Sequence, residues 1–158
     1  MSYRLTVTGP GPTTGYDAWK ASFIFPPGRD GPLDDPDSDG AQNLIEFVAG
    51  SNPTTPGPSG LPGVAVVLGQ LIGSPASPAK TYCIFKARVR KARTGITLIP
   101  QVGNTPASIA AAGALVGQAG APVSDPADSA FEFITYYYTV ALEDTPAGKV
   151  FMRLGVGL

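Results

Sequence analysis

The chain has 158 residues and a nearly balanced charge, with 11 lysines and arginines against 12 aspartates and glutamates. This balance gives no general attraction for nucleic acid or an anionic membrane surface, so we expect neither as a partner. Histidine is absent and Cys83 is the single cysteine, which excludes Ser-His-Asp and Cys-His catalysis and imidazole-bound zinc. We therefore expect a protein that is not an enzyme.

Glycine and proline indicate the architecture. The 20 glycines and 17 prolines favour short strands, turns and stiff connectors over long helices. The length suits one domain with its own core. No stretch approaches the ~18 to 20 apolar residues that cross a bilayer, so no membrane span is expected. The composition predicts a mainly β domain.

The chain opens with a strand-like segment. Tyr3, Leu5 and Val7 alternate with polar residues, which is typical of a half-buried strand. A connector rich in glycine and proline, residues 9–15, separates this strand from the rest of the chain. Residues 1–15 therefore predict an N-terminal strand arm with a linker.

A helix-loop-helix segment is predicted over residues 16–56. Apolar residues recur at helical spacing over residues 16–25, before two prolines. They recur again over residues 44–48, before Gly50 in the position of a C-terminal cap. Two short helices are therefore expected to flank the loop between them.

That loop has the ligand spacing of a calcium-binding loop. Oxygen-bearing side chains occupy loop positions 1, 3, 5, 9 and 12, and glycine stands at position 6. Ca²⁺ prefers six to eight oxygen ligands, and a glutamate at the last position can close the shell with both of its oxygens. Calcium is therefore the expected cofactor. The predicted ligands are Asp35, Asp37, Asp39, the backbone carbonyl of Ala41, Asn43 and Glu46.

A plainer alternative is an acidic surface loop that caps the second helix, which begins near Ala41. One aspartate is enough for such a cap. The full ligand spacing, ending in Glu46, favours calcium.

Five strands are predicted beyond a stiff linker at residues 53–63. The last two are expected to pair as a hairpin around a turn at residues 145–148. Residues 106–119 are rich in alanine and predict a short helix or a packed loop. Residues 57–158 then form an antiparallel β-sandwich, which carries the arm and a small helix-loop-helix calcium-binding insert in one compact domain. The five predicted strands cover residues 64–72, 81–92, 95–102, 131–143 and 149–156.

Three groups of side chains in these strands have ordinary interpretations. Cys83 lies in an apolar run and is expected to be a buried thiol. The basic residues of segment 86–93 are expected to form a solvated strand face rather than an anion site. Residues 136–138 are three tyrosines, which predict core packing on one face and an exposed aromatic on the other. Such an exposed ring can stack on a sugar, which is the alternative for this group.

Five segments of the chain carry a recognisable pattern: Tyr16-Asp17-Ala18-Trp19, the loop 35–46, Phe47-Val48-Ala49-Gly50-Ser51-Asn52-Pro53, Ile84-Phe85-Lys86-Ala87-Arg88 and Ala147-Gly148-Lys149-Val150-Phe151-Met152-Arg153-Leu154. Together they resemble a module found near the C-termini of secreted and surface proteins of Verrucomicrobia and related bacteria. In that family a calcium loop similar to dockerin and thrombospondin type 3 repeats precedes a β-sandwich. The match is good over residues 16–56 and loose beyond, and it departs at Ser38 and Asn52, where the family usually has glycine and aspartate. The resemblance implies an extracellular or cell-surface, non-catalytic module.

Three function classes are compatible with these features. The favoured one is a structural subunit that donates its N-terminal strand to a neighbouring copy and so assembles into a filament. The second is an accessory module that binds surface polysaccharide or docks a larger protein. The third, a metal-assisted hydrolase, is disfavoured because calcium would occupy every carboxylate of the loop and leave no base.

Overall fold

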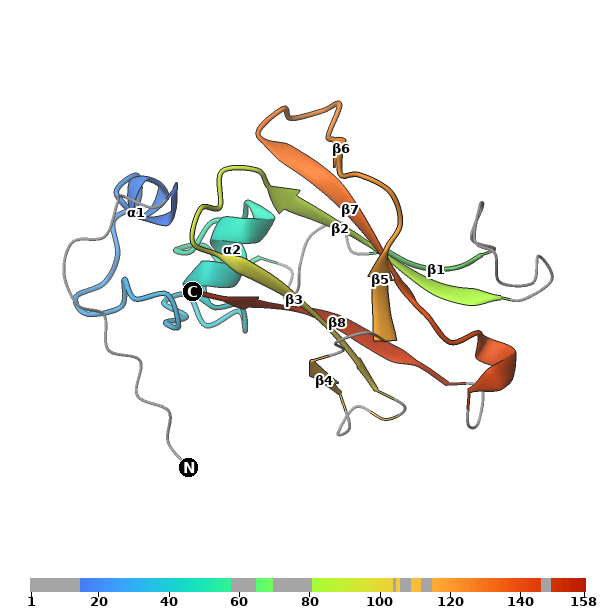
Figure 1. Cartoon of the computed structure of the whole chain (residues 1–158). Coiled ribbons are helices and arrows are strands. Elements are labelled where there is room, and N and C mark those ends of the chain that lie inside the picture. Colours follow the sequence, from blue (N-terminus) through green and yellow to red (C-terminus); the bar gives the residue numbers. More distant parts are fainter. Residues whose placement is uncertain are drawn as a thin grey trace.

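The computed structural model describes residues 15–57, 65–69, 81–103, 105, 109–111, 115–145 and 149–158. Within these ranges the chain consists mainly of strands in two antiparallel sheets, with two short α-helices at one end (Figure 1). The prediction of a mainly β fold is confirmed. The predicted arm, with Tyr3, Leu5 and Val7, lies outside the described residues.

The helices are α1 (Gly15–Lys20) and α2 (Asn43–Ala49). Gly50 ends α2 with φ of 85°, a left-handed conformation that glycine adopts without strain, as predicted for a C-terminal cap. α1 is shorter than the helix predicted over residues 16–25, because the hydroxyl of Ser22 donates to the carbonyl of Trp19 (2.6 Å) and the chain turns there. In the part of the chain that is described, no helix has the length and apolar character needed to cross a membrane.

The larger sheet contains β1 (Ala65–Gly69), β2 (Tyr82–Arg90), β5 (Val116–Gln118), β6 (Val123–Ser124) and β7 (Phe131–Tyr138). Its strand order is β1-β2-β7-β5, and β6 pairs with β7 as well. β2 alternates buried Ala87 and Val89 with more exposed basic residues, as its sequence pattern predicts.

The smaller sheet contains β3 (Thr97–Gly103), β4 (Ala110–Ala111) and β8 (Phe151–Gly157). Its order is β4-β3-β8, so β3 is the central strand. β3 and β8 pair along the whole of their length, from Thr97 opposite Gly157 to Gly103 opposite Phe151.

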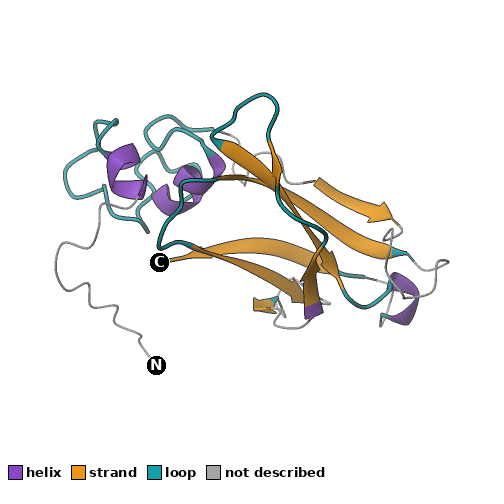
Figure 2. Ribbon diagram, turned by 45° about the horizontal axis from the view of Figure 1, so that its top comes forward, coloured by secondary structure: helices purple, strands orange, loops and turns teal. Residues whose placement is uncertain are grey.

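One apolar core joins both sheets to both helices. Phe47 of α2 and Phe85 of β2 are almost fully buried in it, and Leu154 of β8 reaches it from the smaller sheet. Tyr16 of α1 contacts the same core edge-on to the Phe47 ring. The helices lie together at one end of the sheets in a second view also (Figure 2). The two sheets share this core, and their arrangement as a β-sandwich stays a prediction.

The hairpin predicted between residues 131–143 and 149–156 is wrong. β7 ends well before residue 143, and a 3-10 helix, η3 (Leu142–Asp144), follows it. The N–H of Leu142 donates to the carbonyl of Thr81 (2.9 Å), which holds this turn beside the start of β2. β8 therefore begins away from β7 and pairs with β3.

The interpretation of residues 106–119 as a helix or packed loop is also wrong where the segment is described, because β4 and β5 lie there. Gly117 of β5 is covered by the side chain of Tyr137. A Cβ atom at Gly117 would come within 2.5 Å of the tyrosine ring. The small residue allows β5 to approach β7 beneath that ring.

Candidate metal centre

The predicted calcium loop is fastened to the start of α2 and reverses direction sharply. The N–H of Asn43 donates to the carbonyl of Asp34 (2.8 Å), which closes the chain before the loop onto the helix. Ser38 and Gly40 have φ of 61° and 94°. Gly40 thus supplies the backbone freedom for which its position in the motif predicts glycine.

Asp35, Asp37 and Asp39 converge on one point. One carboxylate oxygen from each lies within 4.8 Å of those of the other two. All three side chains are half-buried rather than extended into solvent. Three carboxylates this close repel one another unless a cation lies between them.

The loop backbone orients these carboxylates. Four N–H groups donate to the three aspartates and fix which oxygens remain available. These bonds run from Gly40 to Asp35 Oδ2 (3.0 Å), from Asp39 to Asp37 Oδ1 (3.3 Å), from Ala41 to Asp39 Oδ1 (2.8 Å) and from Gly57 to Asp39 Oδ2 (3.0 Å).

The buried polar atoms that lack a partner gather at this loop. Among the described residues, every buried side-chain oxygen or nitrogen without a hydrogen bond belongs to a predicted ligand. Leaving such atoms unpaired costs about 1–3 kcal/mol each, and more for a charged group. Unpaired oxygens of this kind are suited to a partner that accepts electron pairs, such as a cation. The atoms are Asp35 Oδ1, Asp37 Oδ2, Asn43 Oδ1, Glu46 Oε1 and Glu46 Oε2.

The orientation of Asn43 is set by its amide nitrogen. Asn43 is fully buried, and its Nδ2 donates to the carbonyls of Arg29 (3.1 Å) and Gly31 (2.8 Å). Both amide hydrogens are thus occupied, and Oδ1 remains as an acceptor without a donor. A metal ion is a natural partner for this oxygen, since no side-chain rotation can pair it without breaking the two existing bonds.

Glu46 is the most buried acid of the site, with no exposed surface on α2. Burial, and next the charge of Asp37, raise its pKa from 4.5 to about 7 in the metal-free protein. The nearby hydroxyl of Ser51 opposes this rise without making a hydrogen bond of ordinary geometry. Burial likewise raises the pKa of Asp37. These carboxylates are thus costly to ionise in the metal-free protein, and protonation or a bound cation would relieve that cost.

The alternative of a simple acidic cap does not describe α2. Its N-cap residue is Gln42, whose side chain makes no capping bond. The aspartates bond the backbone of their own loop, and Asp39 also bonds Gly57 beyond the helix. They therefore organise the loop rather than the helix end.

The structure bears on the predicted ligands in different ways. Asp35, Asp37 and Asp39 are brought together, and Asn43 and Glu46 each present unpaired buried oxygen. A purely oxygen donor set of this kind fits a hard cation such as Ca²⁺. Ala41 is buried and fixes Asp39 through its N–H, whereas the role of its carbonyl stays a prediction.

Sequence reasoning missed how the predicted calcium loop is attached to the sheet. Arg90 of β2 donates from Nε to the carbonyl of Phe47 (2.9 Å), and Arg88 donates to that of Ala49 (3.4 Å). These two carbonyls lie in the last turn of α2, which has no basic residue of its own. Both guanidinium groups also lie over the ring of Phe131, at 3.7 Å for Arg88 and 4.8 Å for Arg90. We call Arg88, Arg90 and Phe131 the arginine clamp.

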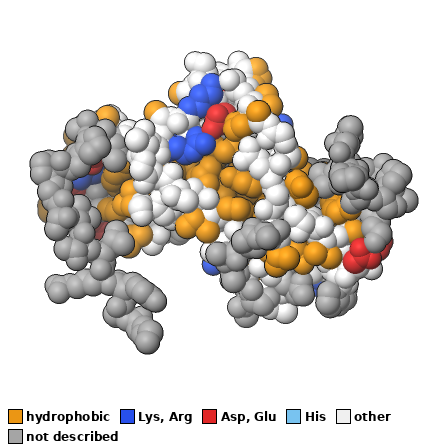
Figure 3. All heavy atoms as spheres, viewed as in Figure 1, with side chains coloured by type: hydrophobic (Ala, Val, Ile, Leu, Met, Phe, Trp, Pro, Cys, Tyr) orange, Lys and Arg blue, Asp and Glu red, His pale blue; other side chains and the backbone are white. Residues whose placement is uncertain are grey.

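The prediction that segment 86–93 is a solvated strand face is wrong for its arginines. Arg88 pairs with Asp125 at 2.5 Å. The same pairing lowers the pKa of Asp125. The neighbouring Arg93 pairs with Glu132 at 2.7 Å. Basic and acidic side chains lie next to each other on the visible face where β2 ends and β7 begins (Figure 3). A helix end without a basic residue, followed by arginines alternating along a strand, is the sequence signal that points to this clamp.

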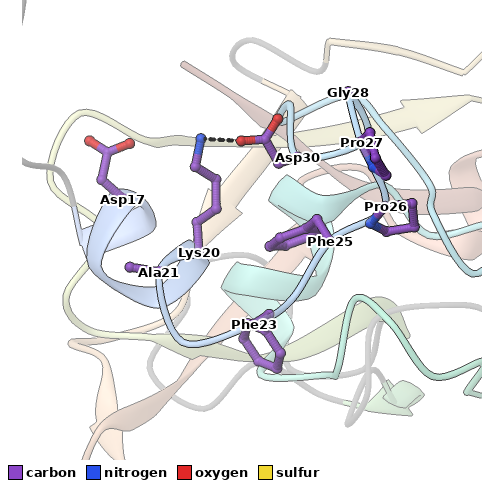
Figure 4. A pocket seen from close by; sticks show the side chains of 9 residues that line it. All are labelled: Asp17, Lys20, Ala21, Phe23, Phe25, Pro26, Pro27, Gly28 and Asp30. Atoms are coloured by element: carbon purple, nitrogen blue, oxygen red, sulfur yellow. Dashed lines mark hydrogen bonds and ion pairs between the residues drawn. The ribbon is translucent and has the colours of Figure 1, made fainter.

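A second candidate site is an open hollow beside α1. It has a volume of about 420 Å³, and Phe23, Phe25 and Pro26 form much of its wall (Figure 4). Lys20 and Asp30 meet at its rim in an ion pair of 2.8 Å. Aromatic walls with a polar rim are typical of sites for small polar ligands.

The structure also tests two further expectations, one for Cys83 and one for the three tyrosines at residues 136–138. Cys83 is a buried free thiol, as predicted, and burial raises its pKa. Tyr136 and Tyr138 are buried on one face of β7, while Tyr137 is only half-buried on the other. Tyr137 covers Gly117, so its ring is committed to packing rather than offered as a platform.

The chain was compared with models of known protein families, with curated proteins and with solved structures, and no match was found in any of the three. The resemblance to a secreted module of Verrucomicrobia therefore stays a prediction from the sequence.

Proposed function

We propose that this chain is a non-catalytic, extracellular structural subunit whose loop 35–46 binds calcium and is rigidified by it. The observation that carries the proposal is the set of buried, unpaired oxygens of Asp35, Asp37, Asn43 and Glu46. Calcium would take one oxygen from each aspartate and from the asparagine, and both oxygens of Glu46. Ala41 would add its carbonyl.

Calcium at this place would add a further link between the loop and α2, which the bonds of Asn43 already connect. The aspartates lie on the loop, whereas Glu46 lies on α2, whose Phe47 and Val48 are buried in the core. The arginine clamp then connects α2 to the larger sheet. An ion shared by loop and helix would thus stabilise the whole helical end of the domain, since binding energy becomes folding energy.

Calorimetric titration with Ca²⁺ and thermal melting with and without chelator test this proposal. We expect one site per chain and a higher melting temperature with calcium. Glu46→Gln should abolish most of the binding because it removes the charge and one bidentate oxygen. Asp30→Asn, an exposed acid outside the loop, is the matched control and should bind like the wild type. A melting temperature that calcium leaves unchanged would reject the proposal.

We further propose that the subunit assembles into a filament through its N-terminal arm. The support is the sequence pattern of Tyr3, Leu5 and Val7, whose apolar face has no apolar partner within the arm or connector. Leu5→Asp should leave a folded, calcium-binding monomer, whereas Thr6→Asp, on the opposite face of the same arm, should still assemble. Light scattering and electron microscopy distinguish the two. A wild type that stays monomeric at high concentration with calcium would contradict assembly.

The accessory-module alternative is supported by the hollow beside α1, which the first proposal does not use. Phe23 and Phe25 can stack on sugar rings, and the charged rim can bond hydroxyl groups. Affinity electrophoresis in gels that contain a soluble β-glucan or xylan tests this function. Phe23→Ala should remove retardation, whereas Ile24→Ala, which is 95% exposed and lies outside the hollow lining, should not. A wild type that neither polysaccharide retards would count against the module.

A further inference from the structure

β8 is the longest strand of the described part that has a partner on one edge alone. β3 covers one edge from Phe151 to Gly157, and no described strand pairs with the other. A free edge exposes unpaired N–H and C=O groups, which short length, proline, bulges or charged side chains usually protect. β8 has no proline, and Arg153 is its single charged residue.

The core-facing side chains of this strand are incompletely covered. Leu154 is buried, but Met152 and Val156 on the same face are only half-buried against the core. Each lies two residues from the next, so the three form an apolar row along the free edge. A strand added beside β8 would complete the burial of this row.

We propose that the free edge of β8 is the acceptor for the N-terminal strand of a second copy of this chain. This inference rests on the proposed filament and names the surface that receives the arm. Residues 2–8 match the seven residues of β8 in length. Tyr3, Leu5 and Val7 repeat the two-residue spacing of the apolar row, and polar residues alternate with them. The arm thus presents apolar side chains to the core side and polar ones to the other face.

The other edge strands in the described ranges are shorter and can pair with fewer residues of the arm. β5 has three residues, and β4 and β6 have two each, too few to hold a seven-residue strand. β1 has five residues and is the nearest competitor. The test therefore uses β1 as its control edge.

Chain geometry favours a second copy over the same chain. β8 runs toward the helices, and the C-terminus lies beside α2 (Figures 1 and 2). The arm joins α1 by its own C-terminal end, so within one chain it would most directly lie parallel to β8. All described strand pairs are antiparallel. An antiparallel return would stretch residues 9–15 almost fully, because they reach at most about 25 Å and β8 is about 24 Å long. A neighbouring copy has no such limit.

Mixed crosslinking of full-length, single-cysteine chains tests the acceptor. In a Cys83→Ser background, one chain carries Leu5→Cys and the other carries Val156→Cys. The chains are mixed with calcium and treated with a short bis-maleimide. We expect a heterodimer crosslinked between positions 5 and 156, at least about tenfold more abundant than with Val67→Cys on β1 as acceptor, because docking raises the effective concentration of the thiols.

The outcomes separate the acceptor from the filament itself. Assembly by light scattering with no crosslink to position 156 would overturn the β8 acceptor and leave the filament in place. A crosslink within one chain that carries both cysteines, without any heterodimer, would place the arm on its own β8 and overturn the second copy. Absence of assembly in the unsubstituted chain would reject the filament and the acceptor together. Adding wild-type chains as a competitor should reduce the heterodimer yield. Adding Leu5→Asp chains should reduce it less, because their arm no longer competes and only their intact β8 edge does.

Discussion

Glu46 belongs both to the proposed calcium site, through its carboxylate, and to the buried helix α2, through its backbone. Its carboxylate is buried without a hydrogen bond, while the backbone of the same residue ends α2 by accepting the N–H of Gly50 (2.7 Å). The residue is thus held in place by the helix cap whether or not its side chain has a partner. An ionised carboxylate that is buried without a partner is costly in the free protein, and the proposed calcium ion would offset that cost.

This position predicts opposite effects of pH on the calcium-free and calcium-loaded protein. In the calcium-free protein the folded pKa of Glu46 is about 7, above its unfolded value of 4.5. The stability that its protonated form contributes is therefore complete below about pH 4.5 and is lost as the pH rises through 7, at most about 3 kcal/mol. Burial raises the pKa of Asp37 as well and acts in the same direction. With calcium the ionised form is needed, so the stabilisation by calcium should grow over the same range.

Melting temperatures from pH 5 to pH 8, with and without calcium, measure both trends. Glu46→Gln should flatten most of the decline in the calcium-free protein, because its side chain does not titrate. A calcium-free melting temperature that rises toward pH 8 would contradict the predicted sign.

Gly50 is the second residue whose identity the structure explains. It has φ of 85°, and a Cβ there would come within 2.4 Å of the Phe131 ring in the arginine clamp. Gly50→Ala should therefore destabilise the fold by about 1–3 kcal/mol, through both backbone strain and a clash.

Gly28→Ala is the matched control for this prediction. Gly28 also has a positive φ, of 71°, but nothing lies within 4 Å of its hypothetical Cβ. Its substitution should cost only the backbone strain. Denaturant unfolding of both variants separates the two terms, and equal losses would show that the Phe131 contact carries no weight.

At the level of elements, α2 connects the proposed calcium loop to the sheet. Its start holds the residues before the loop, its middle carries Glu46, and its last carbonyls are bonded by Arg88 and Arg90 from β2. A seven-residue helix is too short to be stable alone. Its order must come from these contacts and from burial of its apolar face.

The arginine clamp should therefore influence calcium binding from outside the loop. Arg90→Met keeps much of the apolar stem but loses the bond to the Phe47 carbonyl, and should destabilise the domain by about 1–3 kcal/mol. It should also weaken calcium binding, because Glu46 is then held less firmly. Lys91→Met, on the adjacent surface residue that bonds Ser124, is the control. Calorimetric titration and melting of both variants test this, and an unchanged calcium affinity in Arg90→Met would show that the clamp supports the sheet alone.

The difference between local and long-range contacts explains which features could be predicted from the sequence. The loop ligands lie within twelve positions of one another, so their spacing determines a local geometry, and Gly40 and Gly50 marked its turns correctly. The partner of β8 depends on which sheet the chain reaches after η3. No local sequence pattern indicates which sheet that is. The adjacency of two predicted strands therefore suggested a hairpin where the chain crosses to the smaller sheet. For the same reason Arg88 could not be matched to Asp125, which is 37 positions away.

On the scale of the whole molecule, the helical end and the proposed acceptor edge belong to one packed unit. Val156, near the end of β8, contacts the core cluster that contains Phe47 and Val48 of α2. Ile96, which precedes β3, is buried in the same cluster. Loss of order at α2 would therefore reach the end of β8 that faces the helices.

This packing leads to the last prediction, that calcium controls assembly as well as stability. Without calcium, repulsion among Asp35, Asp37 and Asp39 and the buried charge of Glu46 should loosen α2 and, with it, the support of Val156. Filaments of the wild type should then shorten or disappear when a chelator is added below the melting temperature, and should return when calcium is restored. Sedimentation and light scattering measure this directly, with circular dichroism to verify that the sheets stay folded. Glu46→Gln supplies the control, since its assembly should be insensitive to calcium. If chelated wild-type protein assembles as well as the calcium-loaded protein while the loop demonstrably binds calcium, then the metal site and the acceptor edge act independently, and the coupling through α2 is wrong.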